Sequence, residues 1–289
     1  MPLSSSHSQS AAAAIRSYAR KCLASAAADI RKAGGAQGVH GARRGVKRLR
    51  SLLRLVAPAI GMNAANTADR HLRAAADLLA GARRGAALLF AATQLGIQPQ
   101  TEQRLASAIM QHSLAHLDRA TQVAAAAQAL EHIAKVRVAV SGWHLPEAGI
   151  DFYLAGLKRS YGKARRGLAR ALASGDPQAL HNARKHVIHC LHHLELLRTL
   201  WPEIETARLR RFNRLREALG DINDLAELRA IALPGVFPDD TCHQRTVKAI
   251  KKREADLLKS ARKTARRLFA RKPGAFTRRI GTMWEKALA

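Results

Sequence analysis

Apolar residues recur at helical spacing along almost the whole of this 289-residue chain. Runs of β-branched residues are nearly absent, while Ala, Leu and Arg, which favour helices, are abundant. Pro and Gly stand between the periodic stretches, where they break helices. The pattern predicts an all-α fold with helices at 12–33, 38–56, 65–94, 101–127, 151–173, 178–200, 204–231 and 243–271, and a short one at 276–287.

The chain also repeats itself at a separation of about 140 residues. The motif His-x-x-Arg-Arg that starts at His40 recurs as His-x-x-Arg-Lys at His181, and the segment that begins at Leu79 matches the one at Leu219. So long a period indicates duplication of a whole helical unit. We therefore expect two tandem, pseudo-symmetric four-helix bundles, at 12–145 and 146–272, with a flexible N-terminus at 1–11 and a C-terminal helix or tail at 273–289.

The charge of the chain points to a polyanionic partner. Lys and Arg number 49 against 21 Asp and Glu, which gives a formal net charge of +28, and both halves are basic. Such an excess destabilises a folded chain by self-repulsion unless an anion is normally bound. Apolar residues make up 47% of the chain, which is enough for a core and unlike a disordered basic tail.

The clearest cationic surface lies on the predicted helix 38–56. At 100° per residue its basic residues share one face, opposite Val46, Leu49 and Leu53. Like charges at this spacing repel one another, and residues 38–58 contain no acid, so a solvated face of mixed charge does not fit. The face is about 21 Å long at 1.5 Å per residue. It predicts a site for successive phosphates of one chain, formed by His40, Arg43, Arg44, Lys47, Arg50 and Arg54.

The predicted helix 178–200 carries the second copy of this face, with His181, Arg184, Lys185 and His192. Two such helices packed by pseudo-symmetry would face one channel from both sides. Further basic strips extend the predicted site with Arg16, Arg20, Lys21, Arg70, Arg73, Lys158, Tyr161, Lys163, Arg165, Arg166, Arg210, Arg211 and Arg214. A last strip at 248–267 is interleaved with acids and is equally compatible with ordinary surface.

The histidines of the predicted helix 178–200 allow a second interpretation. His189 and His193 are four residues apart, as in some zinc-binding pairs, but the H-E-x-x-H motif is absent. We expect no metal and no cofactor, and we assign His189 to the anion site together with His192. A phosphate beside a histidine favours its protonated form, so affinity should rise on mild acidification.

These motifs resemble those of the CHAD family, the conserved histidine α-helical domain. The resemblance rests on His-x-x-Arg-x-x-x-Lys-Arg-x-Arg-x-x-x-Arg from His40, its weaker partner from His181, and Leu-Gly-Asp-Ile-Asn-Asp at 219–224, and it covers about 12–270. It implies two pseudo-symmetric four-helix bundles that bind inorganic polyphosphate, and an association with polyphosphate granules. The family's basic motif residues correspond to His40, Arg43, Lys47, Arg48, Arg50, Arg54, His181 and Arg184. Ile188 and Leu191 stand where the family's second motif is basic, which reduces the share implied for the second repeat.

Other classes of protein fit less well. No P-loop, Rossmann fingerprint, nucleophile elbow or zinc-hydrolase motif is present, so we expect no enzymatic activity; we expect Glu217, Asp221 and Asp224 to pair with nearby arginines. Nucleic acid is the alternative partner, although aromatic residues are only 4% of the chain. A helical scaffold for acidic proteins is a third possibility. Three widely spaced cysteines favour a cytoplasmic protein, and no apolar run is long enough to cross a membrane.

Overall fold

The structure of the protein is a computed structural model that describes residues 11–32, 36–79, 84–114, 119–146, 150–200 and 206–288. Apart from one 3₁₀ turn, Pro234–Val236, the regular structure in these residues is entirely α-helical, which confirms the predicted fold class. The helices are α1 (Ala11–Arg31), α2 (Ala36–Ile60), α3 (Met62–Leu78), α4 (Arg84–Thr93), α5 (Pro99–Leu114), α6 (Arg119–Ser141), α7 (Asp151–Ser174), α8 (Pro177–Leu200), α9 (Thr206–Ile231), α10 (Asp240–Leu268) and α11 (Pro273–Leu288). Within the described residues, no helix combines the length and apolarity needed to cross a bilayer.

Two of the predicted helices are wrong. The segment predicted as one helix at 65–94 is divided into α3 and α4, and the segment 101–127 is divided between α5 and α6. The breaks fall at 79–83 and 115–118, mostly outside the described residues. The second of these segments contains neither Gly nor Pro, and the first contains two glycines, Gly81 and Gly85, among helix-forming residues. In the second segment, propensity therefore gave no signal that one helix ends and another begins.

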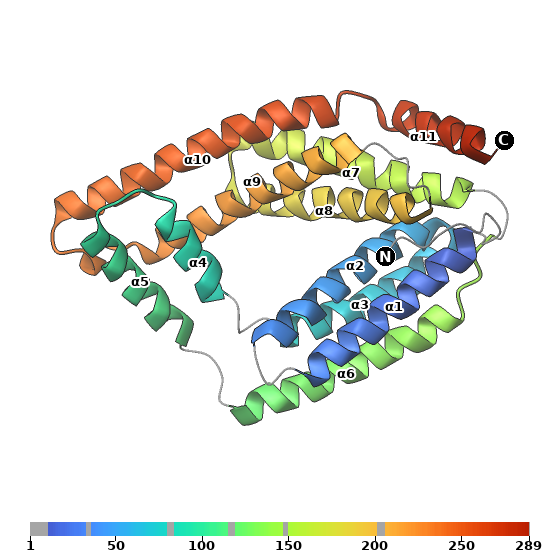
Figure 1. Cartoon of the computed structure of the whole chain (residues 1–289), viewed down its shortest axis with the longest axis horizontal. Helices are drawn as coiled ribbons and strands as arrows, with labels where there is room; N and C mark the ends of the chain where they lie inside the picture. Colours follow the sequence, from blue (N-terminus) through green and yellow to red (C-terminus); the bar gives the residue numbers. More distant parts are fainter. Residues whose placement is uncertain are drawn as a thin grey trace.

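Helices of the first half gather into one group and those of the second half into another (Figure 1). Helices α1, α2, α3 and α6 pack on one another, and α7, α8, α9 and α10 do the same, with α11 against α7. Helix α2 joins the groups by packing on α7 and α8. One core of buried side chains runs through both groups. The exact boundaries at 12–145 and 146–272 stay a prediction.

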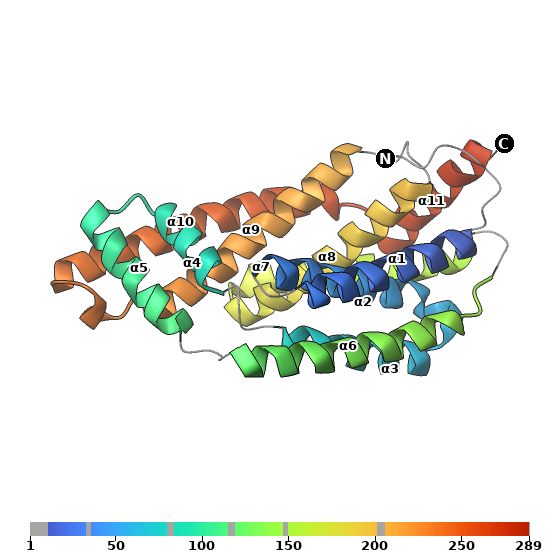
Figure 2. The ribbon, with the colours of Figure 1, turned by 60° about the horizontal axis from the view of Figure 1, so that its bottom comes forward.

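The α4–α5 hairpin departs from this division. It precedes α6 in the chain, yet it packs against α9 of the second group, as two views show (Figures 1 and 2). A separate apolar cluster holds it there, in which Leu88 and Leu105 of the hairpin meet Leu228 and Ile250 of α9 and α10.

The contact between α2 and α7 is a close approach of two backbones. Gly156 of α7 is buried against Leu55 of α2, and a Cβ at position 156 would overlap the Leu55 carbonyl and lie 2.8 Å from its Cα. Only glycine allows the helices to come this close. The contact places the first turns of α7 beside the cationic face of α2.

Candidate anion-binding site

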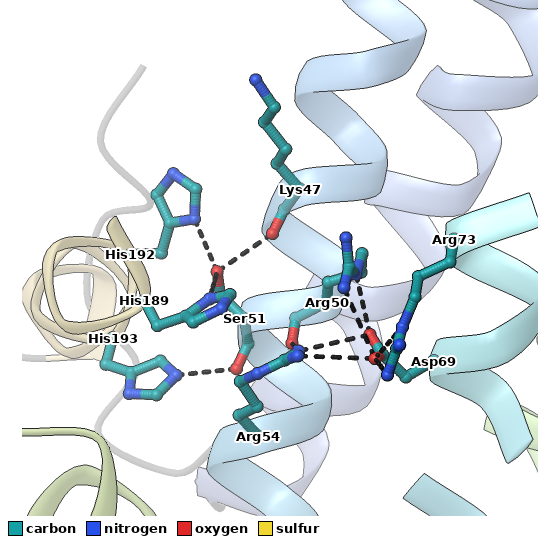
Figure 3. Close-up of polar contacts among 9 residues, drawn as sticks. All are labelled: Lys47, Arg50, Ser51, Arg54, Asp69, Arg73, His189, His192 and His193. Carbon is teal, nitrogen blue, oxygen red and sulfur yellow. Dashed lines mark hydrogen bonds and ion pairs between the residues drawn. The ribbon is translucent and has the colours of Figure 1, made fainter. Parts of the chain in front are cut away.

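The cationic face of α2 lies where α2 meets α3, α7 and α8. Its opposite side is buried as predicted, with Val46, Leu49 and Leu53 at most 2% exposed. This burial fixes the rotation of the helix, so that Arg50 and Arg54 are directed toward α3 (Figure 3). Helix α8 approaches the same stretch of α2 with three histidines. The predicted approach of α8 to α2 therefore occurs, but through the histidines at 189–193, whereas His181 and Arg184 contact α9.

Ser51 is the point at which α8 is attached to α2 (Figure 3). Its hydroxyl donates to the carbonyl of Lys47 at 2.9 Å and lies 2.8 Å from Nδ1 of both His189 and His192. Its own carbonyl accepts a hydrogen bond of 2.7 Å from Nε2 of His193. Three imidazoles of one helix are thus oriented by a single serine of another.

These contacts determine the tautomers. A serine hydroxyl has one hydrogen and two lone pairs. Because Ser51 Oγ gives its hydrogen to Lys47, both His189 and His192 must donate to it from Nδ1. Each neutral ring then presents an unprotonated Nε2, and no other hydrogen bond holds either ring within the described residues. In this state neither ring can donate to an anion.

Burial keeps these histidines uncharged. It lowers the pKa of His189 well below its usual value, and the charges of Arg54 and the neighbouring histidines lower it further. Burial, with the charge of Arg48, lowers the pKa of His192 to about 3, and burial lowers that of His193 to about 4. At neutral pH the free protein therefore presents neutral imidazoles beside its arginines.

Asp69 of α3 organises the arginines (Figure 3). Its carboxylate, 5% exposed, accepts from Nε of Arg50 at 2.8 Å, Nη1 of Arg54 at 3.2 Å and Nε of Arg73 at 2.9 Å. Arg54 also donates to the Arg50 carbonyl at 2.8 Å. Burial alone would raise the pKa of Asp69, but hydrogen bonds and charges from Arg50 and Arg54 outweigh it and lower the pKa to about 2.

Replacing Asp69 by Asn is expected to destabilise the protein by about 2 kcal/mol at pH 7, since a pKa lowered by almost two units corresponds to that energy. Because the folded pKa lies below the unfolded one, this contribution is present above about pH 4 and is lost as the pH falls toward 2. Urea unfolding at pH 7 measures it. Asp77→Asn, an exposed position on the same helix, is the control and should change stability by less than about 0.5 kcal/mol. Equal effects of the two substitutions would contradict the role of Asp69.

A cavity of about 140 Å³ opens beside these groups. Cationic or titratable side chains surround it from four helices, and Leu53, Ala57 and Ala65 contribute apolar surface. Its lining includes Arg54, Arg73, Arg159, Lys163, His186 and His189, with Asp69 behind them. A recess with many cationic donors and one acid, itself already occupied by arginines, is suited to an anion.

Eight of the residues predicted from sequence come together here. Seven of them line the cavity or lie within electrostatic range of residues that do, and the eighth, Lys47, lies within electrostatic range of His192; the seven are Arg50, Arg54, Arg73, Lys163, Lys185, His189 and His192. Arg48 lies near His192, and its buried Nε has no hydrogen-bond partner among the residues that the structure describes.

Three other predicted residues have contacts that stabilise the fold. Arg43 donates from Nη1 to the carbonyls of Ala76 and Leu79 at 3.1 and 3.0 Å, at the end of α3. Nδ1 of His181 lies 2.8 Å from Oδ1 of Asn223 in α9. Arg184 donates to the Arg216 carbonyl at 3.3 Å. In α9, Glu217 pairs with Arg216 at 2.8 Å, as expected for an acid among arginines.

The structure does not bring Tyr161, Arg165 and Arg166 to the cavity. Tyr161 is fully buried on the side of α7 that faces the end of α10, and its hydroxyl, which has one hydrogen to donate, lies 3.1 Å from the carbonyl oxygens of both Leu268 and Arg271. Arg165 donates from Nε to the Phe269 carbonyl at 2.9 Å. Helix α7 is basic on two sides, and the sequence does not tell which side meets α2.

The remaining predicted residues do not line the cavity either. They are wholly or partly exposed on the outer parts of α1, α2, α3, α7 and α9: Arg16, Arg20, Lys21, His40, Arg44, Arg70, Lys158, Arg210, Arg211 and Arg214.

Sequence reasoning missed three residues of the site: Ser51, Asp69 and His186. Arg159, which the sequence places in the same basic strip as Lys158 and Lys163, also lines the cavity. Asp69 had a signal, because it is the first acid after Asp29. Ser51 also stands out, because it is the one small polar residue in the predicted helix 38–56. Within the described residues, no group of three or more His, Cys, Asp or Glu side chains is arranged to hold a metal ion.

The fold is that of an all-helical protein with a cationic recess between four of its helices. A family model described as the CHAD domain matches residues 6–233, and the chain belongs to this family. Among solved structures, the CHAD domain from the plant Ricinus communis matches with a TM-score of 0.59 and 17% identity, over 92% of this chain and 94% of that one. PptA from Streptomyces chartreusis matches with a TM-score of 0.59 and 15% identity, over 91% and 100% of the two chains. No curated protein matches.

Proposed function

We propose that this protein binds inorganic polyphosphate in the recess between α2, α3, α7 and α8, and that it does so without catalysing a reaction. The observation that carries the proposal is the convergence of Arg54, Arg73, Arg159 and Lys163 from three helices on one small cavity. Along α2, Arg50 and Lys47 carry further positive charge beyond the residues that line the cavity. Membership of the CHAD family supports the proposal, since the resemblance in the sequence motifs implies polyphosphate as the ligand.

A polyphosphate chain fits the recess better than nucleic acid does. Proteins that bind single strands stack bases on aromatic side chains. The residues that line the cavity include no Phe, Tyr or Trp, and their apolar members are Leu, Ala and Met. Phosphate groups need only cationic donors, which the lining supplies.

The test is a titration of labelled polyphosphate of defined lengths at several salt concentrations. The affinity for polyphosphate should rise with its chain length. It should fall steeply with salt concentration, because protein binding releases the counterions that are condensed on the polyphosphate. In a second experiment, unlabelled DNA, RNA or free phosphate is added to displace the labelled polyphosphate. DNA that competes as well as polyphosphate, per phosphate, would favour the nucleic-acid alternative. Absence of released phosphate during prolonged incubation supports a binding protein; its release would show catalysis. Microscopy of the tagged protein in polyphosphate-rich cells tests the association with granules.

Lowering the pH from 8 to 5.5 is expected to increase the affinity for polyphosphate about tenfold or more. His189 and His192 present unprotonated Nε2 atoms, so each must take up a proton before it can donate to a phosphate. Binding coupled to proton uptake strengthens as the pH falls. Dissociation constants at constant ionic strength measure the effect, and calorimetry in buffers of different ionisation enthalpy counts the protons.

The double variant His189→Gln, His192→Gln is the control for this effect, because glutamine keeps a donor that does not titrate over this range. Its affinity should change much less with pH. Unfolding curves at each pH are needed beside it: unfolded histidines take up protons below pH 6.5 and these buried ones do not, so the free protein loses stability as the pH falls. A dissociation constant of the unsubstituted protein that is independent of pH would contradict the role of the histidines.

A further inference from the structure

A second cavity lies between α7 and α10 and shares no lining residue with the first. Its volume is about 760 Å³, within the range of small-molecule sites. It follows α7 from Arg165 to Ala173 and α10 from Arg262 to Phe269. Two of the residues that the central recess does not use, Arg165 and Arg166, belong to it.

Two arginines fix the width of this groove. Arg165 of α7 donates from Nε to the Phe269 carbonyl of α10 at 2.9 Å. Arg262 of α10 donates from Nη2 to the Leu172 carbonyl of α7 at 3.0 Å. The two bonds cross between the helices in opposite directions, one at each end of the cavity. These two hydrogen bonds therefore fix the distance between the two sides of the groove.

The floor of the groove is apolar and its walls are cationic. Leu168, Leu172 and Phe269 are at most 7% exposed and form the floor together with alanines. Arg166 and Arg170 of α7 and Arg266 of α10 are exposed. All eleven lining residues are Arg, Leu, Ala or Phe, so no side chain of the lining can accept a hydrogen bond.

This lining selects the chemistry of a ligand. A nucleobase or a sugar would bring donors that find no side-chain acceptor, at a cost in binding free energy. Inorganic phosphate or polyphosphate would leave the apolar floor uncovered. An aliphatic chain covers the floor, and an acidic head group pairs with the guanidinium groups. We propose that the groove between α7 and α10 binds a free, single-chain anionic amphiphile, of the class of fatty carboxylates and alkyl phosphates.

The test uses the full chain with decanoate and decyl phosphate as probes, at concentrations where both are monomeric. Calorimetry should show saturable binding at one site. Decanol, which lacks the charge, and inorganic phosphate, which lacks the chain, should bind at least tenfold more weakly. Inorganic phosphate that binds as tightly as decyl phosphate would overturn the proposal, because the groove would then be a simple cationic surface.

Two variants locate the binding. Ala169→Trp fills the groove from an exposed position of α7 and keeps every charge, and Arg166→Gln with Arg170→Gln and Arg266→Gln removes exposed charges. Each should weaken binding of decyl phosphate at least tenfold while the helical circular dichroism is retained. Substituting Lys47 and Lys163 by Gln at the central recess should leave this binding unchanged, whatever it does to polyphosphate binding. Full binding by Ala169→Trp, or binding only to vesicles of anionic phospholipid, would refute the proposal.

Discussion

Replacing Gly156 by alanine is expected to destabilise the protein by about 3 kcal/mol, an amount typical of forced overpacking in a core. The added methyl group would overlap the Leu55 carbonyl of α2, and backbone cannot move aside as a flexible side chain can. Helix α7 must therefore shift away from α2, and this shift loosens the packing of the core that the two groups of helices share. The midpoints of thermal and urea unfolding, followed by circular dichroism, measure the loss.

Gly162→Ala on the same helix is the matched control. Gly162 is also buried, but a Cβ there would meet only side-chain atoms, Nη1 of Arg166 at 3.4 Å and Cγ of Pro273 at 3.5 Å. Alanine in a helix interior is favoured over glycine by about 1 kcal/mol, so this variant should be as stable as the original or more stable. If both substitutions lowered stability equally, the close approach at Gly156 would not be the cause.

Removing three exposed cations of the recess is expected to weaken polyphosphate binding on the order of a hundredfold at physiological salt. The variant is Lys47→Gln, Arg159→Gln, Lys163→Gln, which removes the charges and keeps polar side chains of unbranched stem. Each cation that contacts a phosphate contributes roughly 0.7 to 0.9 to the slope of log affinity against log salt. The slope should therefore fall by about 2 to 3. Fluorescence titration at several salt concentrations measures both quantities.

A second triple variant removes the same charge elsewhere. Lys248, Lys251 and Lys252 are exposed in the first half of α10. The first half of α10 extends toward the α4–α5 hairpin and away from α2 (Figure 1). Their replacement by Gln should change the dissociation constant by no more than about threefold, through long-range attraction alone. Equal losses in the two variants would mean that the net charge of +28 binds the polymer diffusely, without a defined site.

The helical periodicity of the sequence was sufficient to predict the fold class and the rotation of α2. Val46, Leu49 and Leu53 define one buried face, and the cationic face must then lie on the other side. The same logic failed for α7, where Tyr161 is buried against α10 and Lys163 lines the recess. A helix that packs on both sides carries no single apolar stripe, so its period does not assign each basic residue to a neighbour.

Ser51 and Asp69 stand out in the sequence only by their type, and the sequence does not give their roles, because these depend on partners in other helices. Ser51 matters through His189 and His192, which lie 138 and 141 residues away. Asp69 matters through Arg50 and Arg54 of the preceding helix. Periodicity describes each helix alone, whereas these contacts arise from the packing of α2 on α3 and α8.

The α4–α5 hairpin has a consequence for how the chain can be divided. The hairpin belongs to the first half of the sequence but packs on α9 of the second half. The arrangement is similar to domain swapping between two subunits, except that both parts belong to one polypeptide. Cutting the chain after α6 would leave Leu88 and Leu105 uncovered on one fragment, and Leu228 and Ile250 on the other. Neither fragment would be stable alone, so the two halves should unfold together and should regain their structure only when mixed.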